Sequence, residues 1–165
     1  MEKELAKKRA KELCSRLTLK EKIGQLCQRL YGFRVYEKDS DGSFTYTEEF
    51  VKEVEACGGL GTLYGLFRAD PWSGRGYENG LCGEEAVRVY NMLQKYVLEH
   101  MRIPIPMLLG SECPHGHQAL DGYLLPVNLA VGATFAPNLA KEAAEGEQEL
   151  LLMDGGNELW RGNFI

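Results

Sequence analysis

The feature that most constrains the fold is a short run at residues 105–109 that is almost entirely apolar, next to Pro104 and followed by Gly110. A strand with apolar side chains on both faces needs cover on both, as in a parallel sheet packed between helices. Helical patterns precede and follow this run, and helices that alternate with strands are typical of α/β proteins. The sequence therefore predicts an α/β fold with parallel strands covered by helices.

Two helices are expected at the start of the chain. Residues 3–17 are rich in Ala, Leu, Lys and Glu, which favour helix. Thr18 and Glu21 match the capping-box pattern T-x-x-E, which marks the start of the second helix. The apolar stripe of that helix is expected to consist of Ile23, Leu26, Cys27 and Leu30.

The clearest helix spans residues 83–101, where one buried face is expected to consist of Ala86, Tyr90, Leu93, Val97 and Met101. Between the early helices and this one, we expect a hairpin or surface excursion at 31–46, then a helix over 47–55 that Thr47 caps and Gly58 and Gly59 stop, and a strand at 60–67. Later in the chain, we expect an apolar segment at 127–135 and a helix from Pro137 to about 151.

Charge and cysteine content exclude several classes of protein. The chain has 19 Lys and Arg against 24 Asp and Glu, a net charge of -5, whereas a nucleic-acid partner requires a basic surface. No apolar run reaches the roughly 18 residues of a membrane span, and the charged N-terminal segment indicates no secretory signal. The five cysteines are scattered, without C-x-x-C, which indicates free thiols and a cytoplasmic location.

The loop at 110–122, G-S-E-C-P-H-G-H-Q-A-L-D-G, holds the densest group of chemically active side chains. In α/β folds such groups gather just beyond the carboxyl ends of strands. One interpretation is that the polar side chains of this loop only form hydrogen bonds with the loop's own backbone, as polar groups in tight loops commonly do. A second is that it binds a metal through Glu112, Cys113, His115 and His117. A third is that it binds a sugar whose hydroxyl groups donate to Glu112.

Five segments of the chain, in this order, form a recognisable set: L-T-L-K-E-K-I-G-Q-L at 17–26, G-L-G-T-L-Y-G-L-F-R-A-D-P-W-S-G-R at 59–75, Y-N-M-L-Q at 90–94, R-I-P-I-P-M-L-L-G-S-E-C-P-H-G-H at 102–117 and L-P-V-N-L-A-V-G-A-T-F-A-P-N-L at 125–139. The set resembles the N-terminal part of glycoside hydrolase family 3, which contains β-glucosidases, β-xylosidases and related exo-acting enzymes. The resemblance covers about residues 15–145 and leaves 146–165 as an atypical tail.

The resemblance implies the opening portion of a (β/α) TIM-type barrel, as a single domain over residues 1–165. Glu112 matches the acidic residue that holds sugar hydroxyls in the family's glycone subsite, and His115 and Gly116 match the adjacent H-G that shapes the loop. The complete enzyme would hydrolyse terminal β-linked sugars with retention of configuration. The implied ligand is a small sugar or β-glycoside, and no cofactor or metal is expected.

The residues of catalysis are not recognised in this sequence. A retaining glycosidase needs two carboxyl groups about 5–5.5 Å apart, and the family's S-D-W motif, which carries the nucleophile, does not occur. Arg161 is a candidate for the family's sugar-binding arginine, although its W-R-G departs from the family's W-G-R, and an unrelated tail is the alternative.

Length leads to the same expectation. A barrel needs about 250 residues, so we expect a truncated chain that is inactive alone and whose open sheet edges favour self-association. Two other hypotheses stay open. One is a non-catalytic carbohydrate-binding or interaction remnant that uses Glu112 and Trp72, and the other is a metal-dependent hydrolase built on the loop at 110–122.

Overall fold

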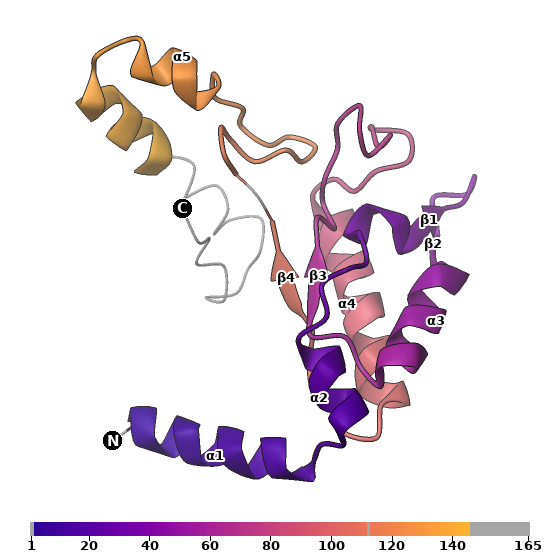
Figure 1. Cartoon of the computed structure of the whole chain (residues 1–165). Helices are drawn as coiled ribbons and strands as arrows, with labels where there is room; N and C mark the ends of the chain where they lie inside the picture. Colours follow the sequence, from indigo (N-terminus) through magenta and orange to yellow (C-terminus); the bar gives the residue numbers. More distant parts are fainter. Residues whose placement is uncertain (1, 112, 146–165) are drawn as a thin grey trace.

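The computed structural model describes residues 2–111 and 113–145 (Figure 1). Its elements are, in chain order, α1 (Glu2–Arg16), α2 (Leu19–Gln25), the 3-10 turn η1 (Gly32–Arg34), β1 (Tyr36–Lys38), β2 (Phe44–Tyr46), α3 (Glu48–Cys57), β3 (Thr62–Tyr64), α4 (Glu84–His100), β4 (Leu108–Gly110) and α5 (Asn128–Gly132). Residues 137–145 are also helical, as expected from Pro137.

A β–α–β unit forms the centre of the molecule. β3 and β4 run parallel, with Thr62 opposite Leu108 and Tyr64 opposite Gly110, and α4 connects them. Figure 1 shows the two strands side by side with α4 against them. The core consists of apolar side chains from this unit, from α3 and from the hairpin: Tyr36, Phe50, Val54, Leu60, Leu63, Val89, Leu93 and Val97. The fold is thus a mixture of helices and small sheets that includes a parallel pair.

No closed barrel is present in the described part of the chain. Its strands form two separate two-stranded sheets, the antiparallel hairpin β1–β2 and the parallel pair β3–β4. Figure 1 shows α1 extending away from the core at one end of the molecule, with α5 standing off at the other.

The helix signals at 18–21 and 47–59 are confirmed. Thr18 and Glu21 form the complete capping box, each side chain bonded to the other's backbone N–H. The Thr47 hydroxyl caps α3, and Gly58 ends that helix with a left-handed φ of 65°, which costs glycine no steric penalty. The predicted hairpin at 31–46 is also present, although Phe33, Val35 and Tyr36 are buried, so the segment belongs partly to the core.

The predicted apolar stripe of α2 is wrong at Ile23 and Leu26 but correct at Leu30, which is buried in the core with Cys27 partly buried against it. The helix ends at Gln25, Ile23 is exposed, and Leu26 is 88% exposed. Gly24 and Glu21 are the buried residues instead. A Cβ at Gly24 would collide with the Cys57 carbonyl oxygen, so the helix packs by a close backbone approach that only glycine permits.

The predicted strand at 105–109 is shifted and is not covered on both faces. β4 begins at Leu108, which is 57% exposed, while Met107 and Ile103 are buried before the strand starts. Pro104 and Pro106 lack the backbone N–H that pairing with a neighbouring strand requires, so β4 begins only after Pro106. The apolar segment at 127–135 contains α5, in which no residue is buried against the described part of the chain.

Candidate functional site

Two loops leave the same end of the parallel sheet. Because β3 and β4 are parallel, the loop after each strand starts at their common carboxyl end, the usual place for functional groups in α/β folds. The Ala69 N–H donates to the Gln118 carbonyl at 2.8 Å, and Arg68 and Ala119 form an antiparallel bridge. The two loops are therefore joined directly through their backbones.

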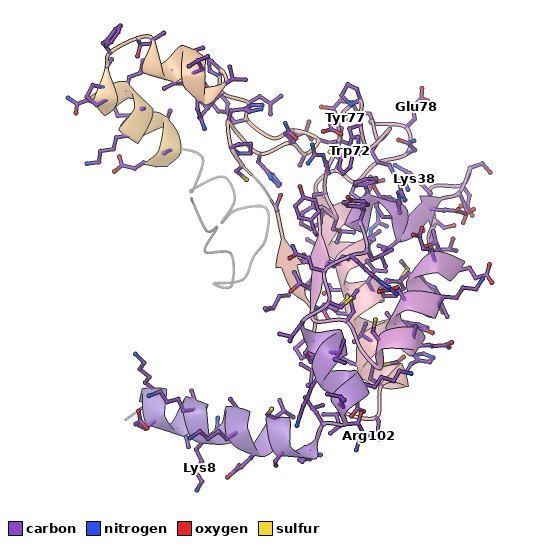
Figure 2. The ribbon with its side chains drawn as sticks, in the orientation of Figure 1. Lys8, Lys38, Trp72, Tyr77, Glu78 and Arg102 are labelled. Atoms are coloured by element: carbon purple, nitrogen blue, oxygen red, sulfur yellow. The ribbon has the colours of Figure 1, made fainter. Side chains whose placement is uncertain are left out.

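Asp121 ties the loops together a second time through side chains. Its carboxylate accepts a hydrogen bond from the Tyr77 hydroxyl at 2.7 Å and lies 2.7 Å from the Cys82 thiol. Both hydrogen bonds lower the pKa of Asp121 below its ordinary value, and the bond from Cys82 has the larger effect. Figure 2 shows Tyr77 and Trp72 at this end of the molecule, and Arg102 at the opposite end. An ionised Asp121 thus holds the second loop against the first.

The loop after β4 also folds back on its own backbone. The His117 N–H donates to the Tyr123 carbonyl at 3.0 Å, and the Leu125 N–H donates to the His115 carbonyl at 2.7 Å. Gly116 has a φ of +106°, and a Cβ there would collide with the Tyr123 carbonyl oxygen. This part of the sequence therefore needs glycine for the tight return of the chain.

The structure brings together some of the predicted site residues. His117 is buried, and its Nδ1 lies 3.6 Å from the Cys113 sulfur. His115 is half-buried, and its Nδ1 is shielded from solvent without a hydrogen-bond partner among the described residues. Glu112 and Arg161 lie outside the described residues.

The described candidates for a metal in this loop do not converge. Cys113, His115 and His117 do not bring three ligand atoms within 4.8 Å of one another, whereas Cys27, Glu53 and Cys57 do so elsewhere in the described chain.

An aromatic cluster beside the site was only partly anticipated from the sequence. The Trp72 ring lies edge-on to Tyr31 and to Phe33, with ring centroids 5.1 Å apart in both cases, and it remains 55% exposed. The Arg68 guanidinium lies over the Trp72 ring at 4.6 Å. Of these three aromatic residues, only Trp72 was expected from the sequence to contribute to a site. The short Y-G-F segment at 31–33 was the available signal for its two partners.

Two hydrogen bonds hold the Arg68 side chain in place. Its Nε donates to the Asp70 carboxylate at 2.8 Å, and its Nη1 donates to the Tyr64 hydroxyl at 3.1 Å. Asp70 in turn accepts the Ser73 N–H at 2.8 Å, which closes a turn over residues 70–73. The cation above Trp72 is therefore positioned before any ligand arrives.

A groove of about 610 Å³ opens beside Trp72. Its walls include Phe33, Glu37, Glu48 and Arg75. Arg75 donates to the Phe33 and Tyr36 carbonyls at 2.7–2.9 Å, which joins this wall to the hairpin. A partly exposed aromatic ring next to carboxylates and a guanidinium suits a polar ligand with one apolar face.

Comparison of the sequence with protein-family models and with curated proteins gives no match. Among the described residues, no helix has the length and apolar character needed to cross a membrane.

Proposed function

We propose that this chain carries one side of the glycone subsite of a family 3 glycoside hydrolase and binds terminal β-linked sugars. The observation that supports this most strongly is the joining of the loops after β3 and β4 at one end of a parallel pair. Both loops belong to segments that resemble the family. In this proposal, β3, α4 and β4 correspond to the opening part of a (β/α) barrel in a cytoplasmic enzyme.

The chemistry of recognition follows from the residue types at this end of the sheet. Glu112 accepts hydrogen bonds from sugar hydroxyls, and charge-assisted bonds of this kind are strong and directional. His115 precedes the loop's tight turn and has a buried Nδ1 that can orient a neighbouring polar group. Trp72 offers an exposed ring for the apolar face of a sugar. Arg161 is the further candidate from the sequence.

Binding without turnover is the expected behaviour of this chain by itself. Retaining hydrolysis requires a nucleophile and an acid/base about 5–5.5 Å apart, and the family's S-D-W motif is not found in these 165 residues. A non-catalytic carbohydrate-binding module would behave in the same way, and it differs from the main proposal in its ancestry rather than in its site.

Titration of the full chain with glucose and with xylose, followed by nuclear magnetic resonance, tests the proposal. We expect saturable shifts that Glu112→Ala abolishes and that Glu99→Ala, an exposed carboxylate on α4, leaves unchanged. Absence of saturable shifts with both sugars would reject the proposed subsite. Robust hydrolysis of aryl β-glucosides or β-xylosides would instead show that the chain holds its own catalytic pair.

A further inference from the structure

Two thiols and a carboxylate converge between α2 and α3, outside the two loops described above. Cys27 follows the end of α2, while Glu53 and Cys57 lie four residues apart on α3, and so on one face of that helix. The Glu53 Oε1 atom is 3.6 Å from the Cys27 sulfur and 3.3 Å from the Cys57 sulfur. All three ligand atoms lie within 4.8 Å of one another.

These separations match the edges of a small tetrahedron. With metal–sulfur bonds of about 2.3 Å and a metal–oxygen bond of about 2.0 Å, tetrahedral geometry places sulfur and oxygen about 3.5 Å apart. The observed separations of 3.3 and 3.6 Å fall on either side of that value. We propose that Cys27, Glu53 and Cys57 bind one thiophilic d¹⁰ cation, for which Zn²⁺ is the expected ion.

The fourth position of such a site is open to solvent. Cys27 and Cys57 line a groove of about 480 Å³ that also includes Ile23 and Ala56, so an ion can enter and a water molecule can complete its coordination. When the ion binds, each thiol releases its proton to solvent and a metal–sulfur bond replaces the S–H bond. No change of oxidation state is involved.

Arg29 competes with the ion for the Glu53 carboxylate. Its guanidinium donates to both Glu53 oxygens, from Nε to Oε1 at 2.6 Å and from Nη2 to Oε2 at 2.7 Å. The Arg29 side chain is 69% exposed, so its contact with Oε1 can break at low cost in packing. The contact with Oε2 can persist and orient the carboxylate, as outer hydrogen bonds do in metal sites. Lys20 adds a second positive charge at the groove.

This competition separates a metal site from a purely structural ion pair. If Glu53 serves only to pair with Arg29, removal of Arg29 affects metal binding only through the loss of one exposed positive charge, which is a small effect. If Glu53 is a ligand, the variant Arg29→Gln removes a competing cation and tightens the site.

The full chain, reduced and stripped of metal, is titrated with Zn²⁺ alone, and bound metal is measured after dialysis. Cd²⁺ serves as a second probe, because its bonds to thiolates absorb in the ultraviolet. We expect one ion per chain in the wild type and in Cys14→Ser, whose thiol is exposed on α1. The double variant Cys27→Ser/Cys57→Ser is expected to bind at least tenfold more weakly, and Arg29→Gln severalfold more tightly.

Alkylation mapped by mass spectrometry keeps the test independent of how well the double variant folds. In the wild-type chain, Zn²⁺ is expected to protect Cys27 and Cys57 from alkylation while Cys14 reacts at an unchanged rate. The proposal is overturned if Zn²⁺ does not bind stoichiometrically, if the double variant binds as well as the wild type, or if Zn²⁺ protects other cysteines instead. It is also overturned if Cys27 and Cys57 form a disulfide and their reduced form binds no Zn²⁺.

Discussion

Arg102 forms a two-point ion pair with Glu21, which precedes it by 81 residues: Nε donates to Oε1 at 2.9 Å and Nη2 to Oε2 at 2.6 Å. The same Glu21 carboxylate accepts the Thr18 N–H at 2.7 Å and so completes the cap of α2. A third bond runs from Arg102 to the Arg16 carbonyl at 2.8 Å. One carboxylate therefore both starts α2 and fixes that helix to the segment after α4.

This arrangement predicts an acid-dependent loss of stability at Glu21. Hydrogen bonding to Arg102, followed by that to Thr18, lowers the pKa of Glu21 from its ordinary 4.5 to about 2. A lowered folded-state pKa stabilises the fold fully above pH 4.5, and this contribution is lost as the pH falls toward 2. Glu21→Gln should therefore melt below the wild type at pH 7, and the gap in melting temperature should close by about pH 2.

Glu99→Gln is the control for this measurement. Glu99 forms an exposed pair with Lys95 at 3.8 Å, and pairs of that kind contribute little to stability. Its melting temperature should follow that of the wild type at every pH. A gap for Glu21→Gln that stays constant from pH 7 to about pH 2 would contradict the assigned role of its charge.

Local signals in the sequence predicted most of the elements. The T-x-x-E box, the Thr47 cap with its Gly58 stop and the helix at residues 83–101 depend on neighbours within a few positions, and the structure confirms each of them. Of the face predicted for that helix, Leu93 and Val97 are buried, while Ala86, Tyr90 and Met101 are only partly buried. The predicted stripe of α2 failed at Ile23 and Leu26 because burial there is decided by distant partners. Arg102 holds the Glu21 side of the helix inward, and Gly24 meets the end of α3.

At the candidate site, too, local features were predicted from the sequence and contacts between distant residues were not. The apolar run before Gly110 correctly indicated which loop follows a parallel strand. The sequence did not indicate that Tyr77 would bond to Asp121, 44 residues later, because such pairings depend on the register of the two strands. Contacts between residues so far apart in the sequence are set by tertiary packing, and no short sequence pattern encodes them.

Gln94 is predicted to be a major stabilising contact between α4 and the approach to β4. Its buried amide accepts the Met107 N–H at 3.0 Å and donates to the Met107 carbonyl at 2.7 Å. Gln94→Leu leaves both backbone groups without their partner, which should cost about 2–4 kcal/mol. Chemical denaturation measures the loss, and Asn91→Leu on the exposed face of the same helix should change stability by less than about 0.5 kcal/mol. Equal effects of the two variants would refute the contact's importance.

Gly116→Ala is predicted to distort the proposed sugar-binding loop. A side chain at this position meets both a positive φ and the Tyr123 carbonyl oxygen, so the expected cost is about 2 kcal/mol or more. Sugar affinity should fall along with stability, because His115 is the adjacent residue. Gly76→Ala is the matched control, since a Cβ added there would have no heavy atom within 4 Å. Unchanged stability in Gly116→Ala would show that the loop adopts another path.

The outer edge of β4 is predicted to mediate association between copies of the chain. Within the described residues, β4 pairs with β3 alone, and the Leu108 side chain on it is 57% exposed. An unpaired strand edge beside apolar surface is a template for pairing with another chain, and a lysine there opposes it. Sedimentation velocity over a range of concentrations should show association that Leu108→Lys weakens about tenfold, the equivalent of about 1.4 kcal/mol. Leu5→Lys, on α1 and also exposed, should have no effect, and a wild-type chain that stays monomeric throughout would rule out this edge as an interface.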